Sequence, residues 1–268
     1  MSTAPSTVTA LLDHVAAGGG RPALTWYGDD GERIELSGAV VLNWVSKTVN
    51  LLVEEFDAGP GTDVVVDLPV GWRQTVWALA AARCGAQVHL ADPGSGTVTE
   101  QPGAEEADVV VTSRPADWSG TTADLVAVAL PALARRFDGE LPAGAVDAAA
   151  AVMTYGDVIG YDPAAGSPAP LTALTARPRT ASEPASDEVS HEVSVEVSHE
   201  VSDDARDGRV LVRGDRPVSA VLATTVGVWA HGGSVVLTSA ATAHALDADA
   251  ARLDRLVATE QITAGHRR

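Results

Sequence analysis

The sequence predicts an α/β fold with a mainly parallel sheet flanked by helices. Short β-branched runs are bounded by Gly and Pro, as in residues 63–69 (DVVVDLP), a pattern typical of strands buried on both faces. The run at 63–69 is followed by apolar residues at helical spacing in residues 71–86 (GWRQTVWALAAARCGA). Strand, helix and strand alternate again in residues 209–260. Parallel neighbours need such helical crossovers, so this order favours parallel pairing.

The elements of the first α/β half, residues 1–160, follow from local spacing. VTALLDHVAA predicts a helix, and PALTWYGDDGERIELS predicts two short strands around the Asp30-Gly31 turn. Ser37 is a candidate N-cap for a helix over residues 38–56, which ends where Gly and Pro follow. The next elements are a strand in DVVVDLP, a helix in GWRQTVWALAAARCGA, and strands in QVHLADP and ADVVVTS.

The second α/β segment, residues 209–268, repeats the alternation. It contains a strand in RVLVRG, a helix in PVSAVLATTVGVWAHGG, a strand in SVVLTS and a helix in DADAARLDRLVATE. We expect this segment to complete the same domain as residues 1–160.

Residues 161–208 between them predict an acidic linker or insertion of low complexity. Four tandem tetrapeptides, EVSH-EVSV-EVSH-EVSD, occupy residues 188–203. A helix would stack their glutamates at i, i+4, where like charges repel. A strand is the alternative, but low complexity and net charge favour disorder. His191 and His199 lie beside glutamates that could join them in a weak metal site, but without fixed geometry we predict no metal.

Charge and composition exclude several classes of function. The net charge of −18 disfavours nucleic acid and anionic lipid as partners, and no basic stripe offsets it. No apolar run approaches the roughly 18 residues of a membrane span, and the N-terminus lacks signal-peptide features, so we expect a cytoplasmic protein without a membrane span. The single cysteine, Cys84, lies in an apolar helical pattern and is predicted to be a core residue.

Several phrases of the sequence resemble the N-terminal subdomain of AMP-forming adenylating enzymes, the acyl-CoA synthetase superfamily. They are the hairpin RPALTWYGDDGERIELS with its following helix, GPGTDVVVDLP, CGAQVHLADP and VWAHGGSVVLTSA. The chain also resembles a small actinobacterial single-copy family with twilight similarity to those enzymes. The resemblance covers residues 5–115 and 207–265. It implies the fold of that subdomain, in a truncated form.

The chemistry of that superfamily depends on a phosphate loop, which we compared with residues 119–122. Ser119-Gly120-Thr121-Thr122 matches the start of the loop, but the second glycine, the proline and the lysine are missing. Asp124 places a negative charge where phosphate needs a positive one. We therefore predict a loop or helix start, with Ser119 or Thr122 as a candidate N-cap, and neither a catalytic residue nor a cofactor site.

Other features offer no substitute for the missing loop. Lys47, the single lysine, lies in the predicted helix over residues 38–56 and is expected to be a surface residue. The histidines at positions 14, 89, 231 and 244 are scattered singly along the chain. The superfamily's adenine, ribose and lid motifs have no counterpart in this sequence. Because losing one charge-stabilising donor typically costs about 10²-fold or more in rate, ordinary adenylation is not expected.

The sequence therefore predicts a catalytically degenerate relative of acyl-CoA synthetases that acts as a non-catalytic binding or regulatory module. Its expected partner is a protein or an acyl-type small molecule. One alternative is a subunit of an AMP-forming acyl ligase whose phosphate loop and lid come from another chain. Another is a purely structural subunit.

Overall fold

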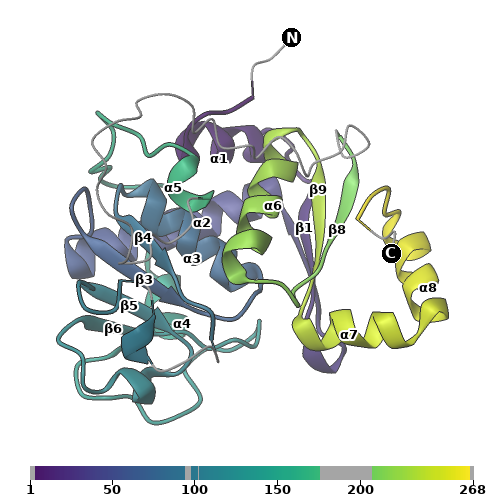
Figure 1. The fold of residues 1–268 in the computed structure, drawn as a ribbon. Coiled ribbons are helices and arrows are strands. Elements are labelled where there is room, and N and C mark those ends of the chain that lie inside the picture. Colours follow the sequence, from purple (N-terminus) through teal and green to yellow (C-terminus); the bar gives the residue numbers. More distant parts are fainter. Residues whose placement is uncertain (1–3, 94–97, 102, 176–206, 266–268) are drawn as a thin grey trace, which may run out of the picture.

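The computed structural model describes residues 4–93, 98–101, 103–175 and 207–265, which form two sheets with helices packed between them (Figure 1). The strands are β1 Pro22–Tyr27, β2 Arg33–Ser37, β3 Asp63–Asp67, β4 Gln87–Leu90, β5 Val109–Thr112, β6 Asp124–Ala127, β7 Val146–Asp147, β8 Arg209–Val212 and β9 Ser234–Thr238. The helices are α1 Val8–Ala16, α2 Gly38–Phe56, α3 Trp72–Arg83, α4 Ala148–Ala151, α5 Thr172–Thr175, α6 Val218–Ala230, α7 Ala240–Ala248 and α8 Ala250–Glu260.

The larger sheet is entirely parallel and has the strand order β4-β3-β5-β6-β7. Val65 in β3 lies opposite His89 in β4 and Val110 in β5, which fixes the register at its centre. The valines of β3 and β5 are fully or almost fully buried. Burial on both faces explains why these strands read as continuous apolar runs.

The smaller sheet joins the two ends of the chain, with the order β2-β1-β9-β8. β1 and β2 form the predicted antiparallel hairpin, while β1 pairs in parallel with β9. Leu24 lies opposite Val235 and Trp26 opposite Leu237, although about 210 residues separate them along the chain. The C-terminal strands therefore supply half of this sheet.

One core cluster joins the inner faces of both sheets to α1, α2, α3 and α6, which lie between them (Figure 1). Trp72 and Trp77 of α3 are both buried, at 4% and 3% exposure, as expected for a helix covered on two sides. At Gly38 an added Cβ would lie 2.0 Å from the Val15 carbonyl oxygen, so glycine permits α2 to approach α1 this closely.

The outer faces of the sheets are covered differently. A small cluster that includes Trp118 packs on the outside of the larger sheet. On the smaller sheet, α7 and α8 cover Leu211 and Val236 (Figure 1). Ser239 caps α7 by accepting a hydrogen bond from the Thr242 N–H. In the described part of the chain, no helix is long and apolar enough to cross a membrane.

The predicted α/β fold with mostly parallel strands is confirmed, and the helix over residues 38–56 has the predicted bounds and its Ser37 cap. Five elements were not predicted, since they are short or lack a clear period: β6, β7, α4, α7 and α5, the last of which lies within the predicted linker 161–208. The repeat at 188–203, with the disorder predicted for it and the metal site considered at His191 and His199, lies outside the described residues.

Candidate functional site

The main candidate site is a cavity of about 850 Å³, here called the large cavity, at the carboxyl ends of strands from both sheets. Its walls come from segments that directly follow β1, β3, β4, β6, β8 and β9. Parallel strands place all their carboxyl ends at the same edge, which is where ligands bind in open α/β sheets. The two sheets direct this edge toward the same cavity, whose volume falls in the range of small-molecule sites.

Helix α3 begins in the wall of the large cavity. Its N-cap, Gly71, makes no side-chain capping hydrogen bond, and the next three residues, Trp72, Arg73 and Gln74, also line the cavity. The first N–H groups of a helix have no intrahelical acceptor, and the helix dipole adds partial positive charge at this end. The start of α3 is therefore suited to an anionic group in the cavity.

Gln74 lines the large cavity with a buried amide that has no partner. Its side chain is 1% exposed, and neither Nε2 nor Oε1 makes a hydrogen bond. The buried Nε1 of Trp72, another residue in the wall of this cavity, is likewise without a partner. Leaving a buried polar group unsatisfied costs about 1–3 kcal/mol, so these unpartnered atoms point to a ligand or ordered water in the cavity.

Arg73 brings a buried positive charge to the same wall. It is 9% exposed, and its guanidinium donates to the carbonyl oxygens of Leu130, Pro131 and Ala132 at 2.8–3.2 Å. Among the described residues, no carboxylate lies within ion-pair distance of it. Burial lowers the pKa of Arg73 to about 10, which reflects the cost of a desolvated charge. The charge of Glu32 acts in the opposite direction and offsets part of this cost, and a bound anion would add a second counter-charge.

The acidic residues of the large cavity are already hydrogen-bonded within the fold. Ser239 Oγ donates to Asp29 Oδ1 at 2.6 Å, and the Val218 N–H at the start of α6 donates to Asp92 Oδ1 at 2.7 Å. Glu32 accepts from Trp26 Nε1 and from the Ala132 N–H, each at 3.0 Å. Each carboxylate thus holds two segments of the wall together.

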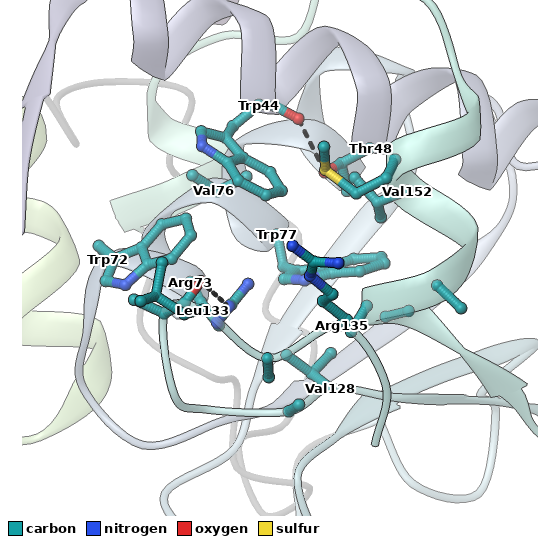
Figure 2. Close-up of a pocket in the computed structure, with 17 residues that line it drawn as sticks. Trp44, Thr48, Trp72, Arg73, Val76, Trp77, Val128, Leu133, Arg135 and Val152 are labelled. Atoms are coloured by element: carbon teal, nitrogen blue, oxygen red, sulfur yellow. Dashed lines mark hydrogen bonds between the residues drawn. The ribbon is translucent and has the colours of Figure 1, made fainter. Parts of the chain in front are cut away.

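A second cavity of about 490 Å³, the tryptophan cavity, is drawn in Figure 2, and it shares two lining residues with the large cavity. It is lined by Trp44, Trp72, Trp77, Arg73, Arg135 and apolar side chains. Trp44 and Trp72 meet edge to face, with ring centroids 5.2 Å apart, and the Arg73 guanidinium lies 4.3 Å from the Trp72 ring. Trp72 and Arg73 belong to both cavities and separate them.

The segment Ser119-Gly120-Thr121-Thr122 lies away from both cavities. It follows the short 3₁₀ helix Pro115–Trp118 and precedes β6, so it reaches the amino edge of the larger sheet, while the large cavity lies at the carboxyl edge. Ser119 and Thr122 are exposed and cap no described helix, whereas Thr121 Oγ1 accepts from the Ala123 N–H. The segment forms a loop.

The structure corrects the expectation for Lys47, which is not a free surface residue. Its side chain is 18% exposed, and Nζ donates to the Tyr155 carbonyl oxygen and pairs with Asp157 at 2.9 Å. The segment after α4 folds back over α2 and covers it. This contact joins residues more than 100 positions apart, so helical spacing could not reveal it.

The other singled-out residues lie apart from the two cavities. Cys84 is fully buried, and desolvation raises the pKa of its thiol to about 11, which confirms a core residue. His89 Nε2 lies 2.6 Å from Asp63 Oδ1. His231 contacts the Gly227 carbonyl oxygen, and His244 is exposed. In the described part of the chain, no three His, Cys, Asp or Glu residues group as metal ligands.

Sequence reasoning missed Arg73 and Gln74. The signal available was their position: two polar residues in the first turn of a helix that directly follows a buried parallel strand. The apolar pattern of the rest of the helix predicted only a buried helix and gave no sign of a site. Only the convergence of both sheets on this turn distinguishes it from an ordinary helix start.

Comparisons with known proteins agree with this architecture. No family model matches the chain. It is 36% identical over 161 residues to the TIGR03089 family protein of Mycobacterium tuberculosis, an overlap that covers 59% of this chain and 64% of that protein. The chain thus spans less than two thirds of the relative it matches.

Solved structures share the fold at low identity. A Brucella canis acyl-CoA synthetase superimposes with a TM-score of 0.63 at 16% identity, covering 92% of this chain and 46% of its own. A mutant of the amide bond synthetase McbA from Marinactinospora thermotolerans gives 0.58 at 18% identity, covering 96% and 48%. The chain has the fold of about half of such an enzyme, as the resemblance predicted, with twilight sequence similarity.

Proposed function

We propose that this chain binds an acyl-type ligand with a carboxylate in the large cavity and does not activate it with ATP. The observation that carries the proposal is Gln74, a residue in the wall of a cavity of ligand size, whose buried side-chain amide has no partner. Leaving both Nε2 and Oε1 without a hydrogen-bond partner lowers the stability of the fold unless a bound molecule supplies the partners. A carboxylate or carbonyl oxygen would accept from Nε2.

The charges around Gln74 support an anionic head group. The uncapped start of α3 and the buried Arg73 both favour negative charge, and Arg216 lines the cavity without an ion pair among the described residues. The carboxylates of Asp29, Glu32 and Asp92 already accept hydrogen bonds from the fold. A carboxylate near α3 would gain charge-assisted donors without displacing a protein contact.

The cavity walls support an apolar body for the ligand. Trp26, Pro69, Val70, Leu130 and Val218 are among the lining residues. The solved structures with this fold include one named as an acyl-CoA synthetase. The similarity in fold, together with an apolar cavity that has one cationic wall, therefore supports an acyl compound as the ligand.

The absence of activation is supported by the loop at residues 119–122. Nucleotide phosphates need several charge-assisted donors. This loop offers hydroxyl groups flanked by the exposed Asp117 and Asp124, and it lies at the sheet edge opposite the large cavity. A triphosphate there would be repelled and would be far from a carboxylate bound beside Gln74.

Calorimetric titration of the protein with octanoate, octanamide and ATP tests the proposal. We expect octanoate to bind, neutral octanamide to bind at least about tenfold more weakly, and ATP to give no signal. Gln74→Met keeps the shape of the side chain and should weaken octanoate by about tenfold. Gln87→Met is the matched control, since Gln87 is exposed and outside the cavity.

Two results would overturn this function. Equal octanoate affinity in the Gln74→Met variant and the wild type would mean that the unpartnered amide serves no ligand. Carboxylate-dependent exchange of pyrophosphate into ATP by the chain alone would show that it activates acids. Exchange that begins only when a copurifying second chain is added would favour the alternative of a ligase with shared parts.

A further inference from the structure

We propose that the tryptophan cavity is a second, separate binding site, whose ligand is a planar aromatic carboxylate. This inference goes beyond the proposed function and does not depend on what occupies the large cavity. It rests on the charge of the lining, the arrangement of the aromatic rings and a guanidinium with no partner.

The lining of the tryptophan cavity differs in charge from the rest of the protein. The chain carries a net charge of −18, yet the residues that line this cavity include two arginines and no Asp or Glu. A cationic ligand would meet repulsion from both guanidiniums and no opposing charge. An anionic ligand would meet two favourable partners, the buried Arg73 and the exposed Arg135.

The aromatic side chains favour a flat ligand. Trp77 is 3% exposed and lies deep in the cavity, while Trp44 and Trp72 meet at 63° and close one side (Figure 2). Indole faces and edges interact with another ring in stacked or edge-to-face geometry, which adds about 0.5–1.5 kcal/mol beyond burial of area. A flexible alkyl chain would gain burial alone and would lose rotational freedom.

Arg135 supplies the free positive charge at this site. Its side chain is exposed, and in the described ranges of the chain it makes no hydrogen bond or ion pair. In Figure 2 it reaches over the cavity beside Trp77. A ring bound below it would be covered by the guanidinium, whose N–H groups could hold a carboxylate at the ring's edge.

The mouth of the cavity is apolar and accessible. Leu133 is 93% exposed and Met153 is 60% exposed, and both belong to its lining. They add accessible apolar surface at the mouth, which a ligand could cover. They would close on the apolar edge of a ligand that enters beside Arg135.

Tryptophan fluorescence and calorimetry with 2-naphthoate test the site. We expect 2-naphthoate to quench the fluorescence and to bind at least about tenfold more tightly than 2-naphthylmethylammonium, which reverses the charge, and than decanoate, which lacks the ring. Arg135→Gln should weaken 2-naphthoate by about tenfold. Arg136→Gln is the control, because Arg136 is exposed and outside the lining.

Further variants separate this site from the large cavity. Trp44→Leu should weaken 2-naphthoate, with melting temperature recorded to show that the variant is folded, and Gln74→Met should leave its affinity unchanged. Three results would overturn the proposal. The Arg135→Gln variant could bind 2-naphthoate as tightly as the wild type, or the protein could prefer the ammonium compound or decanoate. Octanoate could also displace 2-naphthoate competitively while the Gln74→Met variant loses affinity for 2-naphthoate, which would place both ligands in the large cavity. If octanoate does not bind the protein at all, the proposed function fails, but the 2-naphthoate measurements still test the tryptophan cavity.

Discussion

Asp67 and Gln74 lie seven positions apart at the carboxyl end of β3 and are buried to the same degree, at 0% and 1% exposure. Asp67 accepts from Thr112 Oγ1 at 2.7 Å, from Trp118 Nε1 at 2.9 Å and from Arg114 Nη2 at 2.9 Å. The side-chain amide of Gln74 makes no hydrogen bond. The carboxylate is fully hydrogen-bonded within the fold, while the amide is left without a hydrogen-bond partner.

The difference teaches how to separate architecture from site in this molecule. A buried polar group that the chain satisfies itself stabilises the fold and has no capacity left for a ligand. A buried polar group that the chain leaves unsatisfied lowers stability, and its retention needs another reason. Mutations at the two kinds of position should therefore change stability in opposite directions.

The largest effect is expected at Asp67. Asp67→Ala should destabilise the protein by about 3–5 kcal/mol, because the buried donors of Trp118 and Thr112 and the charge of Arg114 lose their acceptor. Urea unfolding measures this change. Asp117→Ala is the control: it removes an exposed partner of the same arginine and should cost at most about 1 kcal/mol. Equal effects at the two positions would break the comparison.

Glu260 is a second internally satisfied carboxylate and adds a pH dependence. Burial alone would raise its pKa, but hydrogen bonds from Arg33, Tyr27 and Arg209 outweigh burial and lower the pKa from 4.5 to about 2. Because the folded pKa is depressed, Glu260 stabilises the fold above pH 4.5, and this contribution is lost as pH falls toward 2.

Glu260→Gln should therefore cost about 2–3 kcal/mol at neutral pH and should weaken the loss of stability between pH 4.5 and 2. Urea titrations across that range provide the measurement. Glu35→Gln, at a half-exposed partner of Arg33, should leave the pH profile nearly unchanged. If the Glu260→Gln variant loses stability between pH 4.5 and 2 as the wild type does, Glu260 is not the source of this pH dependence.

Gln74→Met should act in the opposite direction and raise the free energy of unfolding by about 1–2 kcal/mol, since it removes two unsatisfied polar atoms at similar volume. Thermal melts of ligand-free protein test this. Saturating octanoate should then remove most of this gain, because about tenfold tighter binding to the wild type is worth about 1.4 kcal/mol. If Gln74→Met instead destabilises the ligand-free protein, ordered water already satisfies the amide, and the contrast with Asp67 fails.

The smallest effects are expected at Ser119 and Thr122. Both side chains are exposed and cap no described helix, so replacement by alanine should change stability by less than about 0.5 kcal/mol. Thr121→Ala should cost more, up to about 1 kcal/mol, because its hydroxyl accepts from the Ala123 N–H. ATP-dependent activity that disappears in the Thr122→Ala variant would return this loop to the candidate sites.

The sequence by itself determined the order of the longer elements, the mainly parallel class of the fold and local details such as the Ser37 cap and the burial of Cys84. These depend on neighbours within a few positions, and so periodicity and turn residues report them. It also indicated the resemblance in fold, because phrases such as GPGTDVVVDLP hold a strand and its flanking turns together.

Only the tertiary structure decided how the strands divide into two sheets and where their carboxyl ends meet. β1 pairs with β9 across most of the chain, and Lys47 meets Asp157 through a segment that returns over α2. Whether Asp67 or Gln74 is satisfied depends on such distant partners, which local spacing does not specify. The sequence shows two polar residues near one strand end, but the burial and hydrogen bonds that distinguish them come from residues brought together by the fold.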